Sequence, residues 1–192
     1  MKIYDITQEL FGGKVYPGDP APSYQRVLKI SEGAPCNVTE LKLGAHNATH
    51  MDAPYHFYDD GKTIEQIDLE RCIGPCTVIS LSDLSMEKII LILKGCQKRL
   101  LVKGDVVITL ELAKLLNKYG ILLIGVESQS VGPEGAPMEV HLELLKEEVA
   151  LLEGLELKNV PDGDYFLSAA PLKLGGSDGA PCRAVLFSYQ IT

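Results

Sequence analysis

A strand, a helix and a second strand follow one another in the middle of the chain, and this succession most constrains the fold. Arg99 to Lys103 reads as the first strand. Thr109 is a typical N-cap for a helix from Leu110 to about Lys118, and Gly120 is a typical residue just beyond a helix C-terminus. Ile121 to Val126 is then a fully apolar strand. The pattern predicts an α/β domain with a mixed sheet and flanking helices.

The other segments fit a single domain that covers residues 1–192. A chain of this length, 46% apolar, can bury a sizeable core. The alternation of polar and apolar residues at 37–43 is typical of a half-buried strand. We expect further strands at 2–7 and 76–81, a short helical segment at 64–69, an amphipathic helix that starts at His141, and either a helix or a strand at 86–93.

The charge balance excludes some classes of partner. The net charge is −8 and the pI is near 5.0, so no basic stripe is available to neutralise the phosphates of a nucleic acid. No apolar run approaches the roughly 18 residues of a membrane span, and the N-terminus alternates like a strand instead of forming an apolar signal region. We therefore expect a cytoplasmic protein that acts on a small molecule.

The five cysteines form an odd set, so we expect no disulfide framework. Cys72 and Cys76 have a C-x₃-C spacing that could indicate zinc, but no second Cys or His pair accompanies them. Cys76 also opens a largely apolar strand. Burial is therefore the favoured interpretation of this pair.

Histidine is concentrated in one short stretch. The chain has four histidines, and three of them, His46, His50 and His56, lie within eleven residues. In an extended strand, His46, His50 and Asp52 would share one face, with only the small Ala48 between the two imidazoles. Two imidazoles and a carboxylate in this arrangement suit a divalent cation such as Zn or Mn. An ordinary polar strand face would also fit, but the clustering makes metal binding the favoured interpretation.

Either of two backbone conformations of this stretch would bring His46 and His50 together. As a helix it would still bring His46 and His50 together, but Asp52 would point about 200° further round and Pro54 would soon break the helix. In the strand, the metal face would be the polar one unless Gly44 introduces a bulge. The residues alone leave this phase open.

A histidine and a carboxylate far along the chain can complete the site. In one straight helix, His141 and Glu153 would lie about 18 Å and about 120° apart, so they converge only if the helix ends near Glu148 and the chain turns back. An exposed Glu153 at a helix C-terminus is the favoured interpretation of this segment alone. If Glu153 is buried, a cation would supply the partner that a buried carboxylate needs.

The loop from Tyr16 to Pro20 is dense in turn-forming residues. It is either a plain connection or the wall of a binding pocket, in which Tyr16 would make an apolar contact. The residues favour neither interpretation.

One motif carries a family resemblance. The pattern H-x-G-T-H-x-D-A-P-x-H stands here as His46-Asn47-Ala48-Thr49-His50-Met51-Asp52-Ala53-Pro54-Tyr55-His56. Through this motif the chain resembles the cyclase family of metal-dependent hydrolases, which includes bacterial kynurenine formamidase and isatin hydrolase. Supporting blocks span most of the chain: Tyr16 to Asp19, Ile124 to Glu127 with Ser130, the pair His141 and Glu153, and Pro171 to Leu174 through Asp178, Pro181 and Arg183.

The resemblance implies a swivelling β/β/α fold, a homodimer and a site with one or two divalent ions, with Zn expected before Mn. It implies that His56 is the proton-transfer residue and that Tyr16 contacts the substrate. The ligands it implies are His46, His50, Asp52 and Glu153 for one ion, and Asp52, His141 and Glu153 for a second.

Two departures from the family pattern concern the pocket. Ala48 replaces the motif glycine and adds a methyl group close to the metal site. The segment between Lys103 and Thr109 is shorter than in formamidases, so part of the substrate pocket is missing or rebuilt. We therefore expect the metal chemistry to carry over better than the kynurenine substrate.

The expected reaction is hydrolysis of an amide bond by metal-activated water, in an aryl formamide such as N-formylkynurenine or in a cyclic amide. One alternative is a metal-dependent cyclase or lyase that uses the same site for proton abstraction. Another is a non-catalytic metal-binding protein, which is less favoured because it gives His56 and Tyr16 no necessary role.

Overall fold

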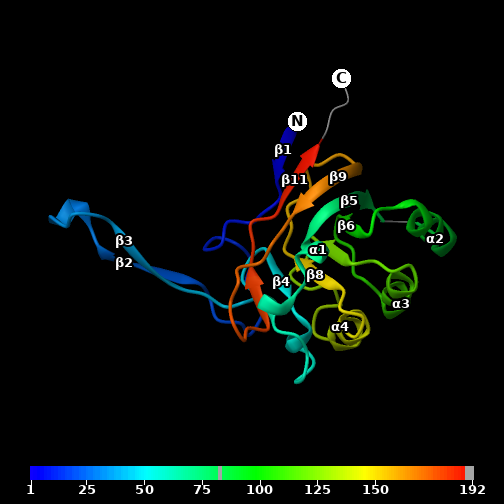
Figure 1. Ribbon diagram of the computed structural model, residues 1–192, viewed down its shortest axis with the longest axis horizontal. Helices are drawn as coiled ribbons and strands as arrows, with labels where there is room; N and C mark the ends of the chain where they lie inside the picture. Colours follow the sequence, from blue (N-terminus) through cyan, green and yellow to red (C-terminus); the bar gives the residue numbers. More distant parts are fainter. Residues whose placement is uncertain (82–83, 189–192) are drawn as a thin grey trace.

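The computed structural model describes residues 1–81 and 84–188 and is built on a nine-stranded mixed sheet (Figure 1). The strand order is β1-β11-β9-β5-β6-β7-β8-β4-β10, and β2 and β3 form a separate two-stranded sheet. The strands are β1 (Lys2–Asp5), β2 (Ser23–Leu28), β3 (Val38–Lys42), β4 (His50–Asp52), β5 (Ile73–Ser80), β6 (Arg99–Lys103), β7 (Leu123–Val126), β8 (Ala150–Glu153), β9 (Gly163–Ser168), β10 (Gly179–Pro181) and β11 (Val185–Ser188).

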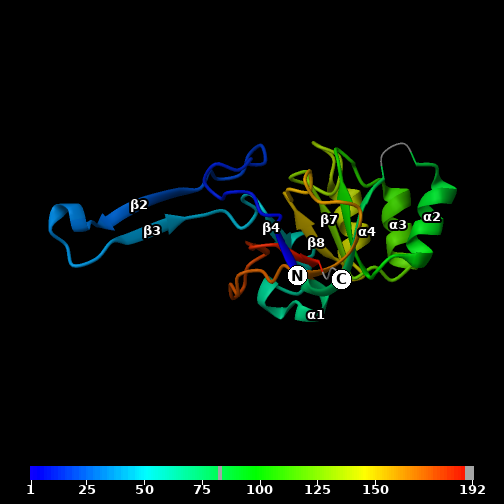
Figure 2. The same ribbon diagram turned by 90° about the horizontal axis from the view of Figure 1, so that it is seen from above.

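Four parallel strands, β5 to β8, form the centre of the sheet. The helices that connect them along the chain lie together on one side of the sheet (Figure 2). The strands at both ends, β9, β11 and β1 on one side and β4 and β10 on the other, pair antiparallel. The helices are α1 (Leu69–Cys72), α2 (Met86–Gly95), α3 (Leu110–Lys118) and α4 (Met138–Leu145), with 3₁₀ helices at Ile30–Glu32, Pro54–His56 and Ile64–Gln66.

The central strands are buried on both faces. In β6, Leu100 and Val102 pack into the core under α2, α3 and α4, whereas Leu101 packs into the opposite core with Met51 and Cys72. This alternation follows from the pleat of a strand. The mixed sheet with flanking helices, predicted from the sequence, is confirmed.

The predicted helix over 110–118 is also confirmed. The Thr109 hydroxyl accepts a hydrogen bond from the backbone N–H of Leu112 at 3.2 Å, and Gly120 has the left-handed φ of +65° that favours glycine after a helix. The open choice at 86–93 is resolved as the helix α2.

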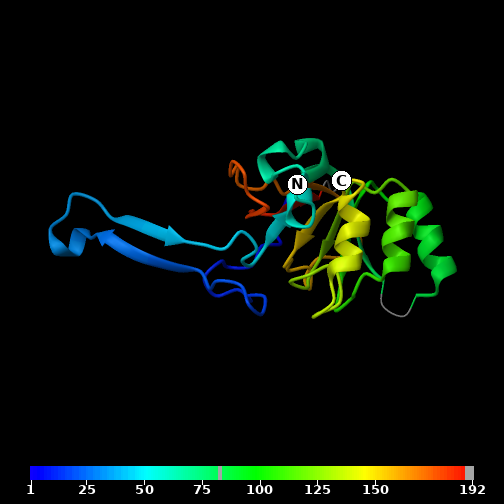
Figure 3. The same ribbon diagram turned by 90° about the horizontal axis from the view of Figure 1, so that it is seen from below.

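Two expectations about strands were wrong. The strand expected from His46 to Asp52 covers only His50–Asp52, because Ala48 has a left-handed φ of +54° that interrupts the extended chain. The strand expected at 37–43 is present as β3, but all of its residues are exposed. It pairs with β2 in a hairpin that extends away from the body (Figure 3).

All five cysteines are free, as expected. Burial raises the pKa of the Cys72 and Cys76 thiols to about 12, which keeps them neutral and supports a packing role for this pair. Among the helices at 1–81 and 84–188, none is long and apolar enough to cross a membrane.

Candidate metal centre

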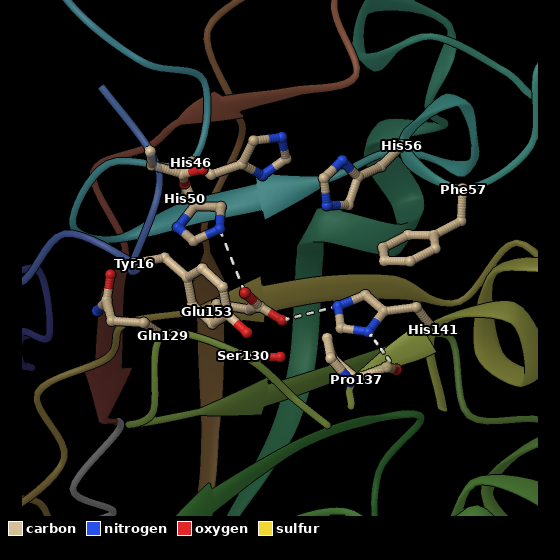
Figure 4. Close-up of a pocket in the computed structure, with 11 residues that line it drawn as sticks. Tyr16, His46, His50, His56, Phe57, Gln129, Ser130, Pro137, His141 and Glu153 are labelled. Carbon is tan, nitrogen blue, oxygen red and sulfur yellow. Dashed lines mark hydrogen bonds and ion pairs between the residues drawn. The ribbon is translucent and has the colours of Figure 1, made fainter. Parts of the chain in front are cut away.

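The centre of the site is a pair of residues on neighbouring strands. β4 and β8 are antiparallel, and their register places His50 directly opposite Glu153. Opposite residues in such a ladder point to the same side of the sheet, and so does Asp52, two residues along β4 from His50. His141 reaches the same point from α4 (Figure 4).

The chain turns back between His141 and Glu153, as their convergence requires. α4 ends at Leu145, Glu148 has a left-handed φ of +55°, and β8 begins at Ala150. Glu153 is only 3% exposed, so the exposed position favoured from its own segment was wrong. Tertiary structure buries Glu153, because β8 lies between β7 and β4 inside the sheet.

Each of the two carboxylates lies between imidazoles. Asp52 Oδ1 is 3.4 Å from His50 Nε2, and Asp52 Oδ2 is 3.6 Å from His141 Nε2. Glu153 Oε2 is 3.3 Å from His50 Nε2, and Glu153 Oε1 is 3.4 Å from His141 Nε2 (Figure 4). Both carboxylates thus reach toward two imidazoles on opposite sides.

Backbone hydrogen bonds fix the orientation of these side chains. The Nδ1–H groups of His50 and His141 donate to the carbonyl oxygens of Ala48 and Pro137, both at 2.9 Å. Each ring therefore presents Nε2 to the carboxylates. Metal-ligating histidines are held by such outer hydrogen bonds, which select the tautomer that leaves the ligating nitrogen free.

The donor set fits a divalent cation. Ligands about 2.0 to 2.2 Å from a tetrahedral zinc ion lie about 3.3 to 3.6 Å from one another, which matches the four Nε2-to-oxygen distances. Asp52 Oδ2 is buried and has no hydrogen-bond partner among residues 1–81 and 84–188. The ligand atoms of His50, Asp52 and Glu153 all lie within 4.8 Å of one another. A cation would satisfy the Asp52 oxygen that the protein leaves unpaired.

His46 joins the site through the turn that precedes β4. Its Nδ1 lies 2.8 Å from Asp52 Oδ1, and its Nε2 lies 2.9 Å from Asp178 Oδ2. His46 and Asp52 therefore lie together, but not because of the strand alternation that the sequence predicted. A left-handed turn at Ala48, and not strand alternation, returns His46 to Asp52.

The electrostatics of the site favour positive charge. Burial lowers the pKa of His50, but hydrogen bonds to Asp52 and Glu153 outweigh it and raise the pKa to about 10. The same balance raises the pKa of His141 to about 10. At His46, burial is outweighed by the charge of Asp52 and the hydrogen bond to Asp178, and the pKa rises to about 9. The site therefore holds either protons or a metal ion.

His56 lies beside the cluster, on the 3₁₀ helix Pro54–His56. Its ring centroid is 4.1 Å from that of His46, and its Nδ1 is 3.2 Å from Asp178 Oδ2. Asp178 thus contacts both histidines, a role that the sequence did not assign to it. The aspartate belongs to a block that carries the family resemblance, but it lies more than 100 residues from either histidine. No local spacing could therefore indicate the contact.

A cavity of about 160 Å³ opens onto these groups. Tyr16 lies in its wall, which fits the pocket interpretation of the Tyr16 loop (Figure 4). Phe57 stacks on the His141 ring with centroids 4.5 Å apart. Phe57, Gln129 and Ser130 line the cavity without having been predicted to do so.

Known proteins resemble this chain over nearly its whole length. The Cyclase family model ("Putative cyclase") matches residues 4–92. The kynurenine formamidase of Bacillus anthracis is 35% identical over 204 residues, which cover 96% of this chain and 97% of that protein. The chain belongs to the cyclase family. The resemblance read from the histidine motif is thereby confirmed.

Solved structures agree with this membership. One, described as a potential metal-dependent hydrolase with cyclase activity, is 30% identical to this cyclase-family chain and has a TM-score of 0.82, covering 98% of both chains. An isatin hydrolase bound to thioisatinate has the same fold, with a TM-score of 0.80, 22% identity, and coverage of 96% of this chain and 91% of that one. The chain is a hydrolase of the cyclase family.

Proposed function

We propose that this cyclase-family chain hydrolyses an amide bond with the help of divalent metal. The observation that carries the proposal is the placement of the Asp52 and Glu153 carboxylates, each between imidazoles at 3.3 to 3.6 Å. Each carboxylate directs one oxygen toward His50 and the other toward His141, and this arrangement suits one or two ions. The first ion would be held by His46, His50, Asp52 and Glu153, and a second by Asp52, His141 and Glu153.

Zinc is the preferred ion, and manganese is the alternative. Each proposed ligand set mixes imidazole nitrogen with carboxylate oxygen, which suits zinc better than the all-oxygen sets typical of manganese. A bound zinc ion lowers the pKa of water from about 15.7 toward about 7 and polarises a carbonyl group. The protein's own contribution is to hold the substrate and to move protons.

His56 is the proposed proton-transfer residue. The Asp178 carboxylate engages its Nδ1, Nε2 makes no hydrogen bond to the described residues, and the side chain lines the cavity. An imidazole can accept a proton from water and return it to a leaving nitrogen near neutral pH. Asp178 would hold the ring in the orientation that this transfer needs.

The shape of the pocket supports a small scissile group on a larger substrate. The cavity at the histidines, about 160 Å³, is much smaller than the neighbouring open groove of about 1070 Å³, and the two share Tyr16, Gln129 and Ser130 in their walls. A formyl or lactam carbonyl would enter the cavity, and an aromatic ring would extend past Tyr16 toward the groove. We propose an aryl formamide such as N-formylkynurenine, or a cyclic amide such as isatin.

We also propose that the protein works as a homodimer. The groove is open along Lys103, Gly104, Asp105 and Val107, where the chain was expected to be shorter than in formamidases. A second subunit would supply walls that one subunit lacks.

Hydrolysis in ¹⁸O-labelled water tests the proposed reaction. We expect zinc-loaded protein to convert an aryl formamide to the free amine and to formate that carries one labelled oxygen, with isatin as the second substrate. Protein treated with a chelator and His50→Ala protein are the controls. A cyclised or dehydrated product with no label would instead support the cyclase or lyase alternative. Failure of the metal-loaded protein to convert either substrate would overturn the proposal.

A further inference from the structure

One buried hydroxyl group in the wall of the cavity has a proton to donate. Ser130 is only 9% exposed, and it lines both the cavity at the histidines and the neighbouring groove. A serine hydroxyl can donate one hydrogen bond and accept two. The Ser130 oxygen accepts one from the backbone N–H of Gly132 at 3.3 Å, and the hydroxyl donates to no residue among 1–81 and 84–188. Because a buried donor without an acceptor is costly, a ligand in the cavity would gain by accepting this proton.

The loop that carries Ser130 is held in place by hydrogen bonds to β8 and within itself. The Ser128 hydroxyl donates to the carbonyl oxygen of Ser130, and the Ser128 carbonyl oxygen accepts from the backbone N–H of Gly154 at 2.8 Å. The backbone N–H of Val131 donates to Glu153 Oε1 at 2.7 Å. The loop therefore fixes Ser130 relative to a proposed metal ligand. A donor that is fixed beforehand needs no rearrangement during a reaction.

The same loop packs against the segment that orients His141. A Cβ atom at Gly132 would lie 2.7 Å from the Cα of Pro137 and 2.9 Å from its carbonyl oxygen, so this close approach requires glycine. The Pro137 carbonyl oxygen is the group that accepts from the Nδ1–H of His141. The position of Ser130 is thus coupled to both Glu153 and His141.

Ser130 and the proposed proton-transfer residue approach the cavity from different sides. Figure 4 shows His56 on one side of the Glu153 carboxylate and Ser130 on the other, and both residues line the cavity. The oxygen and the nitrogen of an amide point in different directions from the carbonyl carbon. A substrate whose nitrogen turns toward His56 would therefore direct its carbonyl oxygen toward the side that holds Ser130.

We infer that the Ser130 hydroxyl donates a hydrogen bond to the carbonyl oxygen of the substrate, an inference that rests on the amide hydrolysis proposed above. When a water oxygen adds to the carbonyl carbon, one electron pair of the C=O bond moves to the carbonyl oxygen, which becomes negative. Ser130 keeps its proton, and its hydrogen bond to that oxygen strengthens. The electron pair then re-forms the C=O bond, the C–N bond breaks, and the nitrogen leaves with a proton from His56.

A pair of substrates that differ in one atom tests this role. Loss of one such donor costs about 10²- to 10³-fold in kcat, so we expect zinc-loaded Ser130→Ala to hydrolyse formanilide about 10²-fold more slowly, with little change in KM. Sulfur is a weak acceptor, so the same substitution should slow the hydrolysis of thioformanilide by less than about 10-fold. A purely structural defect would slow both substrates equally. Ser130→Thr keeps the hydroxyl and should retain most of the formanilide turnover.

Infrared spectroscopy gives a readout that needs no turnover. Benzyl methyl ketone has a methylene group in place of an amide N–H, so it offers a carbonyl oxygen and no bond to hydrolyse. A hydrogen bond to the carbonyl oxygen lowers the C=O stretching frequency. With the ¹³C-labelled ketone bound, we expect a higher frequency in zinc-loaded Ser130→Ala than in the unmodified protein. The matched control is Ser168→Ala, which removes a hydroxyl at the end of β9, outside both cavities, and should change neither the frequency nor the turnover.

Three results would overturn the inference. They are equal stretching frequencies in the unmodified and Ser130→Ala proteins, equal slowing of the oxygen and sulfur substrates, and loss of zinc from Ser130→Ala by elemental analysis. The last result would mean that Ser130 acts through the metal centre and not on the substrate. If the unmodified protein hydrolyses no formanilide, the proposed amide hydrolysis fails, and the infrared comparison still supports or overturns the hydrogen bond to a carbonyl oxygen. The two failures are therefore distinguishable.

Discussion

His50 and Glu153 face each other across the β4–β8 ladder, with His50 Nε2 3.3 Å from Glu153 Oε2. The β4–β8 pairing thus positions two central residues of the candidate metal centre. A shift of register by one residue would turn Glu153 to the other face of the sheet. Because His50 is 1% exposed and Glu153 is 3% exposed, neither can rely on water to balance its charge.

The first prediction concerns metal retention. His50→Ala removes an imidazole whose Nε2 lies 3.3 to 3.4 Å from both carboxylates, so we expect zinc affinity to fall by more than the roughly 10- to 100-fold that loss of an outer-shell partner causes. Asp52→Ala and Glu153→Ala should lose metal and activity together. Elemental analysis and circular dichroism on the same preparations measure metal and fold. Full zinc content in folded His50→Ala protein would remove this histidine from the ligand set.

The second prediction separates catalysis from metal binding. His56 stands beside the cluster and bonds to Asp178, so His56→Ala should keep its metal and lose about 10²- to 10⁴-fold in kcat, as for deletion of one acid-base group. Metal content and turnover are to be measured on one preparation. If His56→Ala loses metal as completely as His50→Ala, His56 is a ligand and another group moves the proton.

Much of the site could be predicted because its residues are close in sequence. Four ligating or acid-base candidates, His46, His50, Asp52 and His56, lie within one motif, and the helix over 110–118 has local signals at both ends. The backbone conformation of the motif could not be predicted from local sequence in the same way. The left-handed conformation at Ala48 depends on tertiary packing that holds an unfavourable φ, and a pattern of residue types does not record it.

Long-range contacts account for the remaining errors. Glu153 appeared exposed from its own segment because only pairing with β4 and β7 buries it. The alternation at 37–43 predicted one buried face, yet β3 is exposed on both. An alternating pattern indicates that one face of a strand can be buried. It does not indicate which element buries that face.

The third prediction concerns Asp178, which contacts both His46 and His56. Asp178→Asn keeps the shape of the side chain and removes its charge, so we expect kcat to fall about 10- to 100-fold, with a small change in KM. Asp19→Asn is the matched control, because Asp19 lines the same cavity and makes no recorded contact with a histidine in the described part of the chain. Equal losses in the two variants would show that Asp178 has no specific role.

The fourth prediction is that rising pH lowers the stability of the metal-free protein and raises its affinity for metal. The raised pKa values of His46, His50 and His141, about 9 to 10, stabilise the metal-free fold below the unfolded pKa of about 6.5. That stabilisation is lost as the pH rises through 9 to 10. Metal must displace these protons, so its affinity rises over the same window.

Thermal unfolding at a series of pH values measures both effects. The difference in Tm between zinc-loaded and chelator-treated protein should widen from about pH 6.5 to about pH 9. A difference that stays constant or narrows would mean that zinc does not compete with protons on these imidazoles.

The last prediction concerns Ala48, where three opposing effects nearly cancel. Its left-handed φ of +54° costs an alanine about 1 to 2 kcal/mol, which glycine would relieve. Glycine would also remove a buried methyl group, worth about 0.8 kcal/mol, and add about 0.5 to 1 kcal/mol of chain entropy to the unfolded state. We therefore expect Ala48→Gly to change the free energy of unfolding by less than about 1 kcal/mol.

Ala48→Val should behave quite differently. The Ala48 methyl lies so close to Gly13 that a Cβ built on this glycine would come within 2.8 Å of it. A branched side chain at a left-handed φ in this space combines backbone strain with overpacking, and we expect a loss above about 2 kcal/mol together with weaker zinc binding. Urea unfolding of the metal-free proteins gives the free energy of unfolding of the glycine and valine variants. If the valine variant is as stable as the glycine variant, the turn at Ala48 does not hold His46 at Asp52 in the way described.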